Sequence, residues 1–120
     1  MILVIEPFYQ SIFSDAGYAK GVVVTSTGGA YNKYSKKYFG VYKSTGKIYY
    51  GKPVYKHSFE QAYLFFNANK NWVIYDQPNK YSGYMYAHKS KSDPTYAGWK
   101  YWDKAWKADP TMKVESGMPS

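Results

Sequence analysis

The stretch Tyr49–Tyr75 reads YYGKPVYKHSFEQAYLFFNANKNWVIY and decides the fold class. It holds three short runs rich in aromatic and β-branched residues, YYGKPVYK at 49–56, YLFF at 63–66 and WVIY at 72–75, with polar residues between them. Apolar runs bounded by turn signals are typical of consecutive antiparallel strands. Asn67–Asn71 predicts a hairpin loop between the last two runs, because asparagine tolerates left-handed backbone angles.

The strand pattern continues on both sides of this stretch. Ser44–Lys47 predicts a turn, with Gly46 supplying a positive φ. In Ser82–Ala87 the alternation predicts Tyr84 and Tyr86 on one face of a strand and Met85 on the other. The further predicted strands are Met1–Ile5, Gly21–Thr25, Phe39–Lys43, Ile48–Tyr50, Val54–His57, Ser82–Ala87 and Thr111–Glu115.

Two segments depart from the strand pattern. Apolar residues recur at helical spacing in Phe8–Lys20, which predicts one short N-terminal helix that Gly17 would end. Tyr31–Tyr38 is polar and basic, and predicts either a loop or an edge strand.

The length of 120 residues indicates one domain. We expect an N-terminal extension at 1–21, a β module at 22–115 and a tail at 116–120. The predicted fold class is all-β or β-dominated, a sandwich or small barrel of short antiparallel strands. Its predicted core is Val22, Val24, Val41, Ile48, Val54, Leu64, Phe66, Trp72 and Ile74.

The composition is unusual in its aromatic residues and its basic residues. Sixteen Tyr, six Phe and four Trp make up 22% of the chain, and the net charge of +8 comes from lysine without any arginine. Reading bases or clamping phosphates usually employs the bidentate fork of arginine. Nucleic acid is therefore a disfavoured partner, although lysines still attract polyanions.

No constellation of residues predicts an enzyme, a metal site or a cofactor. The chain has no cysteine, and His57 and His88 stand in no metal-ligand spacing. His57 and Glu60 could form an acid–base pair, but a surface histidine is the simpler interpretation. No apolar segment has the length of a membrane-spanning helix.

The aromatic residues are therefore the candidate ligand-binding residues. The best cluster is Trp99, Tyr101, Trp102 and Trp106, together with Tyr84 and Tyr86. On a helix the three tryptophans would form one buried stripe. In extended structure Trp102 and Trp106 would share a face, with Trp99 on the other. In both cases we expect at least two of the three tryptophans to be buried.

The order of these motifs resembles a small aromatic-rich β module that recurs, often in tandem, in large surface or secreted proteins of marine microbes, protists and invertebrates. The resemblance covers about 22–114 and rests on Gly51-Lys52-Pro53-Val54-Tyr55, Trp72-Val73-Ile74, Gly98-Trp99 and the closing Asp109–Val114. Lysine-rich loops and the first twenty residues depart from it. That module has no established activity, so the resemblance implies only a β-rich recognition or adhesion unit, often extracellular.

Three function classes follow from these observations. The leading hypothesis is a non-enzymatic module that binds carbohydrate or another surface polymer through exposed Tyr and Trp side chains. The second is a structural, assembly or adhesive protein, such as a matrix or virion component, that forms oligomers or binds a protein partner. The third is binding of polyanions or nucleic acid without sequence preference.

Overall fold

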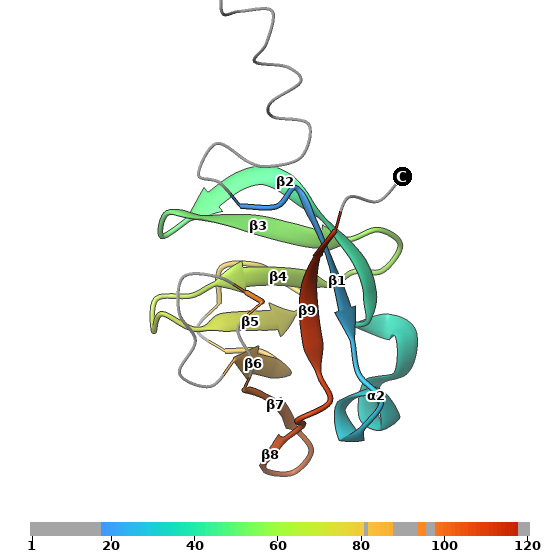
Figure 1. The fold of residues 1–120 in the computed structure, drawn as a ribbon. Coiled ribbons are helices and arrows are strands. Elements are labelled where there is room, and N and C mark those ends of the chain that lie inside the picture. Colours follow the sequence, from blue (N-terminus) through green and yellow to red (C-terminus); the bar gives the residue numbers. More distant parts are fainter. Residues whose placement is uncertain (1–17, 81, 88–93, 96–97, 118–120) are drawn as a thin grey trace, which may run out of the picture.

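Strands make up about half of the computed structural model, which describes residues 18–80, 82–87, 94–95 and 98–117 (Figure 1). The helical elements are α2 (Gly29–Tyr34) and the 3-10 turn η2 (Ser35–Lys37). The strands are β1 (Gly21–Thr25), β2 (Gly40–Tyr49), β3 (Lys52–His57), β4 (Tyr63–Phe66), β5 (Trp72–Tyr75), β6 (Met85–Ala87), β7 (Trp99–Trp102), β8 (Trp106–Ala108) and β9 (Lys113–Gly117). The predicted β-dominated single domain is confirmed.

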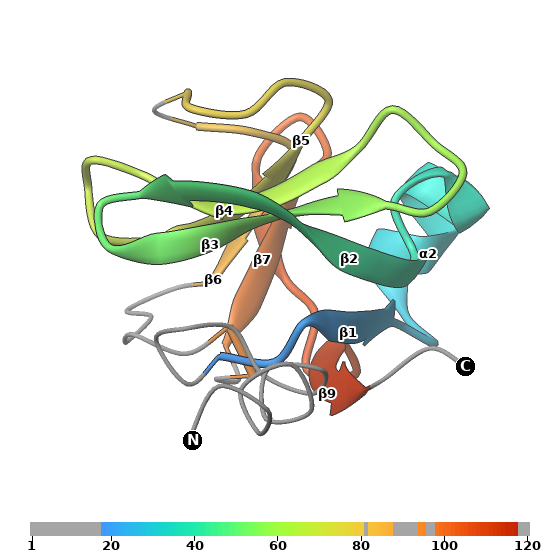
Figure 2. The same cartoon turned by 90° about the horizontal axis from the view of Figure 1, so that it is seen from above.

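The strands of the described residues form one nine-stranded antiparallel sheet, in the order β8-β7-β6-β5-β4-β3-β2-β1-β9. In a flat sheet with spacings of about 4.8 Å, β8 and β9 would lie about 38 Å apart. Only the four residues Asp109–Met112 connect them, and these reach about 18 Å at most. The sheet must therefore curl, and it forms a half-barrel (Figure 2).

The inner face of this half-barrel holds the main hydrophobic core. Trp72 is fully buried and Trp99 is 1% exposed. The ring centroids of Trp72 and Phe66 lie 5.4 Å apart, and those of Trp72 and Tyr55 lie 6.4 Å apart. Large rings thus fill the space that the curled strands enclose.

The outer face carries a second, smaller cluster. Val54, Phe65 and Val73 are buried there by tyrosine rings that pack across them. The covering tyrosines are Tyr49, Tyr63, Tyr75 and Tyr86. An antiparallel sheet usually solvates its outer face, whereas here that face is aromatic.

The β4–β5 hairpin has the strands that the sequence predicts. The pairing runs from Tyr63↔Tyr75 to Phe66↔Trp72. In its loop Asn67 Oδ1 accepts hydrogen bonds from the N–H groups of Asn69 and Asn71, both at 3.0 Å. The left-handed residue is Lys70, with φ of 64°. The asparagine at the start of the loop therefore acts as a hydrogen-bond acceptor for its backbone.

Seven of the nine predicted core residues are buried, namely Val22, Val24, Val54, Leu64, Phe66, Trp72 and Ile74. Val41 is only half-buried. Ile48 is 56% exposed, so its placement in the core was wrong. Ile48 lies at the far end of the β2–β3 hairpin, whereas β1 pairs with β2 only between Gly40 and Lys43. No neighbouring strand among the described residues extends far enough to cover it.

The predicted turn at Ser44–Lys47 is also wrong, because β2 runs through it without reversing. Between the pairs Ser44↔Tyr55 and Ile48↔Pro53 the register shifts, so that β2 holds two more residues than β3 over this interval. Thr45 Oγ1 donates a hydrogen bond of 2.9 Å to the carbonyl of Val54 and secures this bulge. A bulge and a turn both employ small residues and glycine, which explains the error.

The helix of the described residues lies where a loop or edge strand was predicted. Gly29–Tyr34 forms α2, whereas the helix predicted over Phe8–Lys20 falls largely outside the described residues. The glycine at position 29 makes room for the Tyr101 ring, because a Cβ there would clash with the Tyr101 hydroxyl. Close packing of α2 on the sheet thus outweighs the weak helical propensity of its sequence.

The buried carboxylate of Asp109 ties α2 to the β8–β9 connection. Its Oδ2 accepts hydrogen bonds from the Ser26 hydroxyl at 2.7 Å and the Ala30 N–H at 3.0 Å. Its Oδ1 accepts hydrogen bonds from the Thr111 hydroxyl at 2.6 Å and the Thr111 N–H at 2.9 Å. Burial alone would raise the pKa of Asp109, but these hydrogen bonds to the charged form together lower it.

Candidate functional site

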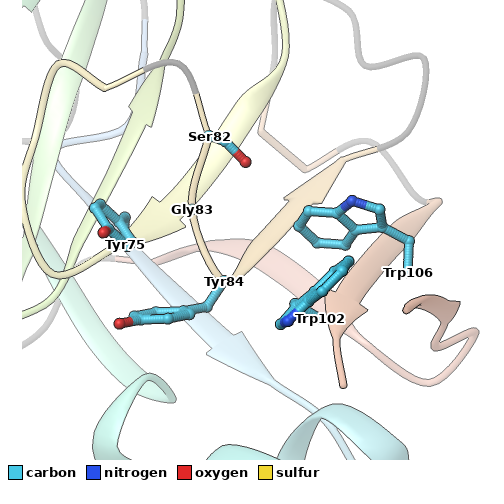
Figure 3. A pocket seen from close by; sticks show the side chains of 6 residues that line it. All are labelled: Tyr75, Ser82, Gly83, Tyr84, Trp102 and Trp106. Atoms are coloured by element: carbon cyan, nitrogen blue, oxygen red, sulfur yellow. The ribbon is translucent and has the colours of Figure 1, made fainter. Parts of the chain in front are cut away.

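The outer face is hollowed at the end of the sheet that β6, β7 and β8 form. A hollow of about 410 Å³ is lined by Tyr75, Ser82, Gly83, Tyr84, Trp102 and Trp106, and we call it the aromatic hollow. Figure 3 shows Tyr75 and Tyr84 on one side of the Gly83 backbone and the two tryptophans on the other. Trp102 is 44% exposed and Trp106 is 36% exposed, so both rings are open to a ligand.

A second hollow of about 270 Å³ adjoins the first. Its lining residues are Asn67, Asn69, Asn71, Val73, Ser82, Tyr86 and Trp106, and we call it the asparagine hollow. Ser82 and Trp106 line both hollows. The β4–β5 loop therefore places amide groups beside the aromatic wall.

A tight hairpin positions the two tryptophans. Trp102 of β7 pairs directly with Trp106 of β8, so both side chains lie on the same face. Their ring centroids are 5.3 Å apart at an interplanar angle of 69°. Lys104, with φ of 64°, supplies the left-handed residue of the three-residue loop between them.

Helix α2 secures this hairpin from its other side. The Tyr34 hydroxyl donates a hydrogen bond of 2.5 Å to the carbonyl of Trp102. The Asp103 carboxylate forms ion pairs with the ammonium groups of Lys33 at 3.5 Å and Lys107 at 3.4 Å. Such exposed pairs each contribute little to stability, but together with the hydroxyl contact they fix the position of the loop.

Gly83 lets the chain entering β6 pass directly against β5. A Cβ at this position would meet the carbonyl oxygen of Ile74 at 2.6 Å and Cγ1 of Val73 at 2.7 Å. The Gly83 backbone therefore forms part of the floor of the aromatic hollow. Only glycine allows this close approach without movement of the strand.

A group of tyrosines extends the hollow toward α2. Tyr84 lies 4.9 Å from Tyr75, 5.6 Å from Tyr34 and 5.4 Å from Tyr38 between ring centroids. Burial raises the pKa of Tyr34 to about 12, with Tyr84 and Asp103 adding to the shift. Burial, Asp76 and Tyr75 also raise the pKa of Tyr84. These phenols are neutral hydrogen-bonding groups at physiological pH.

Asp76 adds a buried acceptor close to the tyrosines. Its Oδ1 is buried and finds no hydrogen-bond partner in the part of the chain that the structure describes. A buried acceptor without a partner is costly. It therefore marks a polar position near the aromatic hollow that the fold alone does not explain.

The structure divides the predicted site residues between the two faces. Trp102, Trp106, Tyr84 and Tyr86 line the hollows, and Tyr84 also packs against the main core. Trp99 and Tyr101 alternate onto the inner face, where they are 1% and 8% exposed, and their rings are unavailable to a ligand. Trp102 and Trp106 share a face opposite Trp99, as expected for extended structure.

The expectation that at least two of these three tryptophans are buried was wrong. Only Trp99 is buried, since β8 is an edge strand and no further element of the described chain covers its outer face. The hollows are also lined by Tyr75, Ser82, Asn69 and Asn71, which were not among the predicted site residues. Tyr75 follows Trp72 and Ile74 in a strand of alternating faces, and this alternation could have placed it outside.

His57 is buried, contrary to the interpretation as a surface histidine. Its Nε2 lies 2.7 Å from the carbonyl oxygen of Phe39, and its Nδ1 accepts hydrogen bonds from the N–H groups of Phe59 and Glu60 at 3.0 and 3.1 Å. Nδ1 therefore carries no proton, and Nε2–H is the donor to Phe39. The ring closes the β3–β4 turn, and its nitrogens are not exposed as a catalytic pair would need.

The described ranges contain neither a metal-binding cluster nor a membrane-spanning helix. No three His, Asp or Glu side chains there gather closely enough to hold a metal ion. Among the same residues, no helix has the length and apolar character needed to span a membrane.

Comparison of the chain with models of known protein families, with curated proteins and with solved structures finds no match. The resemblance to the aromatic module therefore stays a prediction. Any function has to be argued from the two hollows themselves.

Proposed function

We propose that the protein is a non-enzymatic binding module that takes carbohydrate or another surface polymer at the two hollows of its outer face. The observation that carries the proposal is the open aromatic hollow, lined by two tyrosines and two tryptophans. The negative face of an aromatic ring attracts the C–H groups of a sugar ring. Ser82 and the asparagines supply polar groups for the sugar hydroxyls.

The shape and chemistry of the hollow also support this class of ligand. An apolar wall with a few convergent polar groups is the usual form of a ligand site. Trp102 and Trp106 are held by the β7–β8 hairpin and by Tyr34 before any ligand arrives. A preorganised ring loses little conformational freedom on binding, which favours affinity.

A glycan array followed by affinity measurement tests the proposal. The glycan with the strongest signal is titrated into the natural protein and into Trp102→Ala, Trp106→Ala and Phe59→Ala. Phe59 is 89% exposed in the β3–β4 turn and lines neither hollow, so its variant is the matched control. We expect each tryptophan variant to lose at least about tenfold in affinity and Phe59→Ala to bind normally. Absence of binding to every glycan, or equal affinity of all variants, would contradict the proposal.

Assembly with further copies of the chain is a second candidate function. The observation that favours it is the exposure of Ile48 and Tyr50 at the tip of the β2–β3 hairpin. Apolar side chains gathered on a surface mark interaction sites. Light scattering over a concentration series tests this candidate, and a monomer at all concentrations would contradict it.

A further inference from the structure

We infer that the two hollows are adjoining subsites of one groove, which takes an extended glycan chain with neighbouring sugars on either side of Trp106. This inference rests on the proposed function and names the form of its ligand. The two hollows are continuous, because Ser82 and Trp106 line both of them. A ligand that fills one hollow therefore already touches the boundary of the other.

The Trp106 ring lies between a ring of the aromatic hollow and a ring of the asparagine hollow. Its centroid lies 5.3 Å from that of Trp102, which lines the aromatic hollow, and 4.8 Å from that of Tyr86, which lines the asparagine hollow. Both contacts are edge-to-face, with interplanar angles of 69° and 87°. The three rings form a continuous aromatic row across the boundary, so Trp106 presents an aromatic surface to both hollows.

The two hollows offer different chemistry to a ligand. The aromatic hollow has four rings and the Ser82 hydroxyl, which suits the apolar face of a sugar. The asparagine hollow adds the side-chain amides of Asn69 and Asn71, which form no hydrogen bonds with other described residues. An amide both donates and accepts, so it suits an acetamido group or a pair of hydroxyls. The groove therefore stacks one sugar and hydrogen-bonds its neighbour.

Calorimetric titration with oligomers of increasing length tests the inference. The probes are β-1,4-linked N-acetylglucosamine oligomers of one, two, four and six sugars, with the matching glucose oligomers to remove the acetamido group. Occupying two linked subsites makes the second contact intramolecular. We therefore expect one hexamer per protein, bound at least about tenfold more tightly than the monosaccharide. We expect the glucose hexamer to bind more weakly than its N-acetylglucosamine counterpart.

Variants assign each part of the chain to its hollow. Trp102→Ala removes a wall of the aromatic hollow alone, and Asn69→Ala removes an amide of the asparagine hollow alone. We expect each to weaken hexamer binding by at least about fivefold, and Trp106→Ala to weaken it most. Phe59→Ala again serves as the control.

The outcomes separate this inference from the proposed function. Two hexamers per protein, a hexamer no tighter than the monosaccharide, or an effect of only one of the two single-hollow variants would overturn the groove and leave the binding module standing. No binding to either oligomer series would also overturn it. Failure of the proposed function is distinct, because it requires that no glycan on the array binds or that the array glycan binds all variants equally.

Discussion

The two faces of this sheet are built from the same kinds of residue and end in opposite environments. Trp72 and Trp99 on the inner face are at most 1% exposed, whereas Trp102 and Trp106 on the outer face are 44% and 36% exposed. A tyrosine ring packs beside a tryptophan on each face, Tyr55 beside Trp72 and Tyr86 beside Trp106. The curl of the sheet makes the difference, because it closes one face around its rings and leaves the other open.

Aromatic content by itself therefore does not locate a binding surface. Trp99 and Trp102 are three residues apart on one strand, and alternation alone places the first in the core and the second at the hollow. A ring on the inner face should therefore determine stability, and a ring on the outer face should determine binding.

The largest expected effect is on the inner face. Trp72→Ala should lower the free energy of unfolding by about 3–5 kcal/mol, because it leaves a cavity among Tyr55, Phe66 and the neighbouring strands. Urea denaturation measures this change. Trp106→Ala is the matched control and should cost about 1 kcal/mol or less, as expected for a half-exposed side chain. Equal losses of unfolding free energy for the two variants would contradict the division of roles between the two faces.

Asp109→Asn should cost about 2–3 kcal/mol at neutral pH, because an amide replaces a carboxylate that accepts four hydrogen bonds. The pKa of Asp109 is lowered in the folded protein. Its stabilising contribution is therefore fully present above the unfolded pKa of about 3.9 and is lost as the pH falls through the folded value.

Urea denaturation of the natural protein and of Asp109→Asn at a series of pH values between neutral and acid measures this dependence. The difference in unfolding free energy between the two proteins should shrink as the pH falls below about 4. A difference that stays constant over the whole series would show that the carboxylate charge is not what matters.

Gly83→Ala should lower both stability and glycan affinity, since it affects the two faces at once. The added methyl group would displace the chain from Ile74 and Val73 and would move the floor of the aromatic hollow. We expect a loss of about 1–3 kcal/mol in unfolding free energy. Thermal melting and glycan titration of the same sample measure both effects. Normal melting combined with normal binding would show that the backbone there has room to yield.

Ile48→Ala should have the smallest effect, about 0.5 kcal/mol or less, because the side chain is 56% exposed. Leu64→Ala is the comparison variant, and it should cost about 2–5 kcal/mol because Leu64 is fully buried. Parallel denaturation curves of the two variants measure the difference. A large loss for Ile48→Ala would mean that the tip of the β2–β3 hairpin is covered in solution.

Much of the strand layout follows from the sequence. YLFF and WVIY predict β4 and β5 at the observed bounds, and GVVVT predicts β1. Local pattern suffices there, because alternation and flanking turn residues agree. The structures of Ser44–Lys47 and Gly29–Tyr34 were predicted wrongly, because each depends on contacts with residues outside the segment. The hydrogen bond from Thr45 to Val54 secures the bulge, and the contacts of Gly29 and Ala30 with Tyr101 and Asp109 position the helix.

The candidate site was predictable only in part. The cluster 99–106 and the pair Tyr84 and Tyr86 drew attention to the end of the sheet where the two hollows lie. Which of these rings face outward depends on where β7 begins, since a shift of one residue exchanges the two faces. The asparagines of the β4–β5 loop could not be placed beside Trp106 without the order of strands β4 to β8.

Indole N–H resonances of the four tryptophans test the central claim most directly. A ¹H–¹⁵N spectrum is recorded during titration with the glycan that the array identifies, and each indole signal is assigned by a Trp→Phe variant. The two faces predict that the signals of Trp102 and Trp106 shift as the glycan is added, while those of Trp72 and Trp99 stay in place. Shifts confined to Trp72 and Trp99, or a bound glycan that moves none of the four signals, would contradict the account.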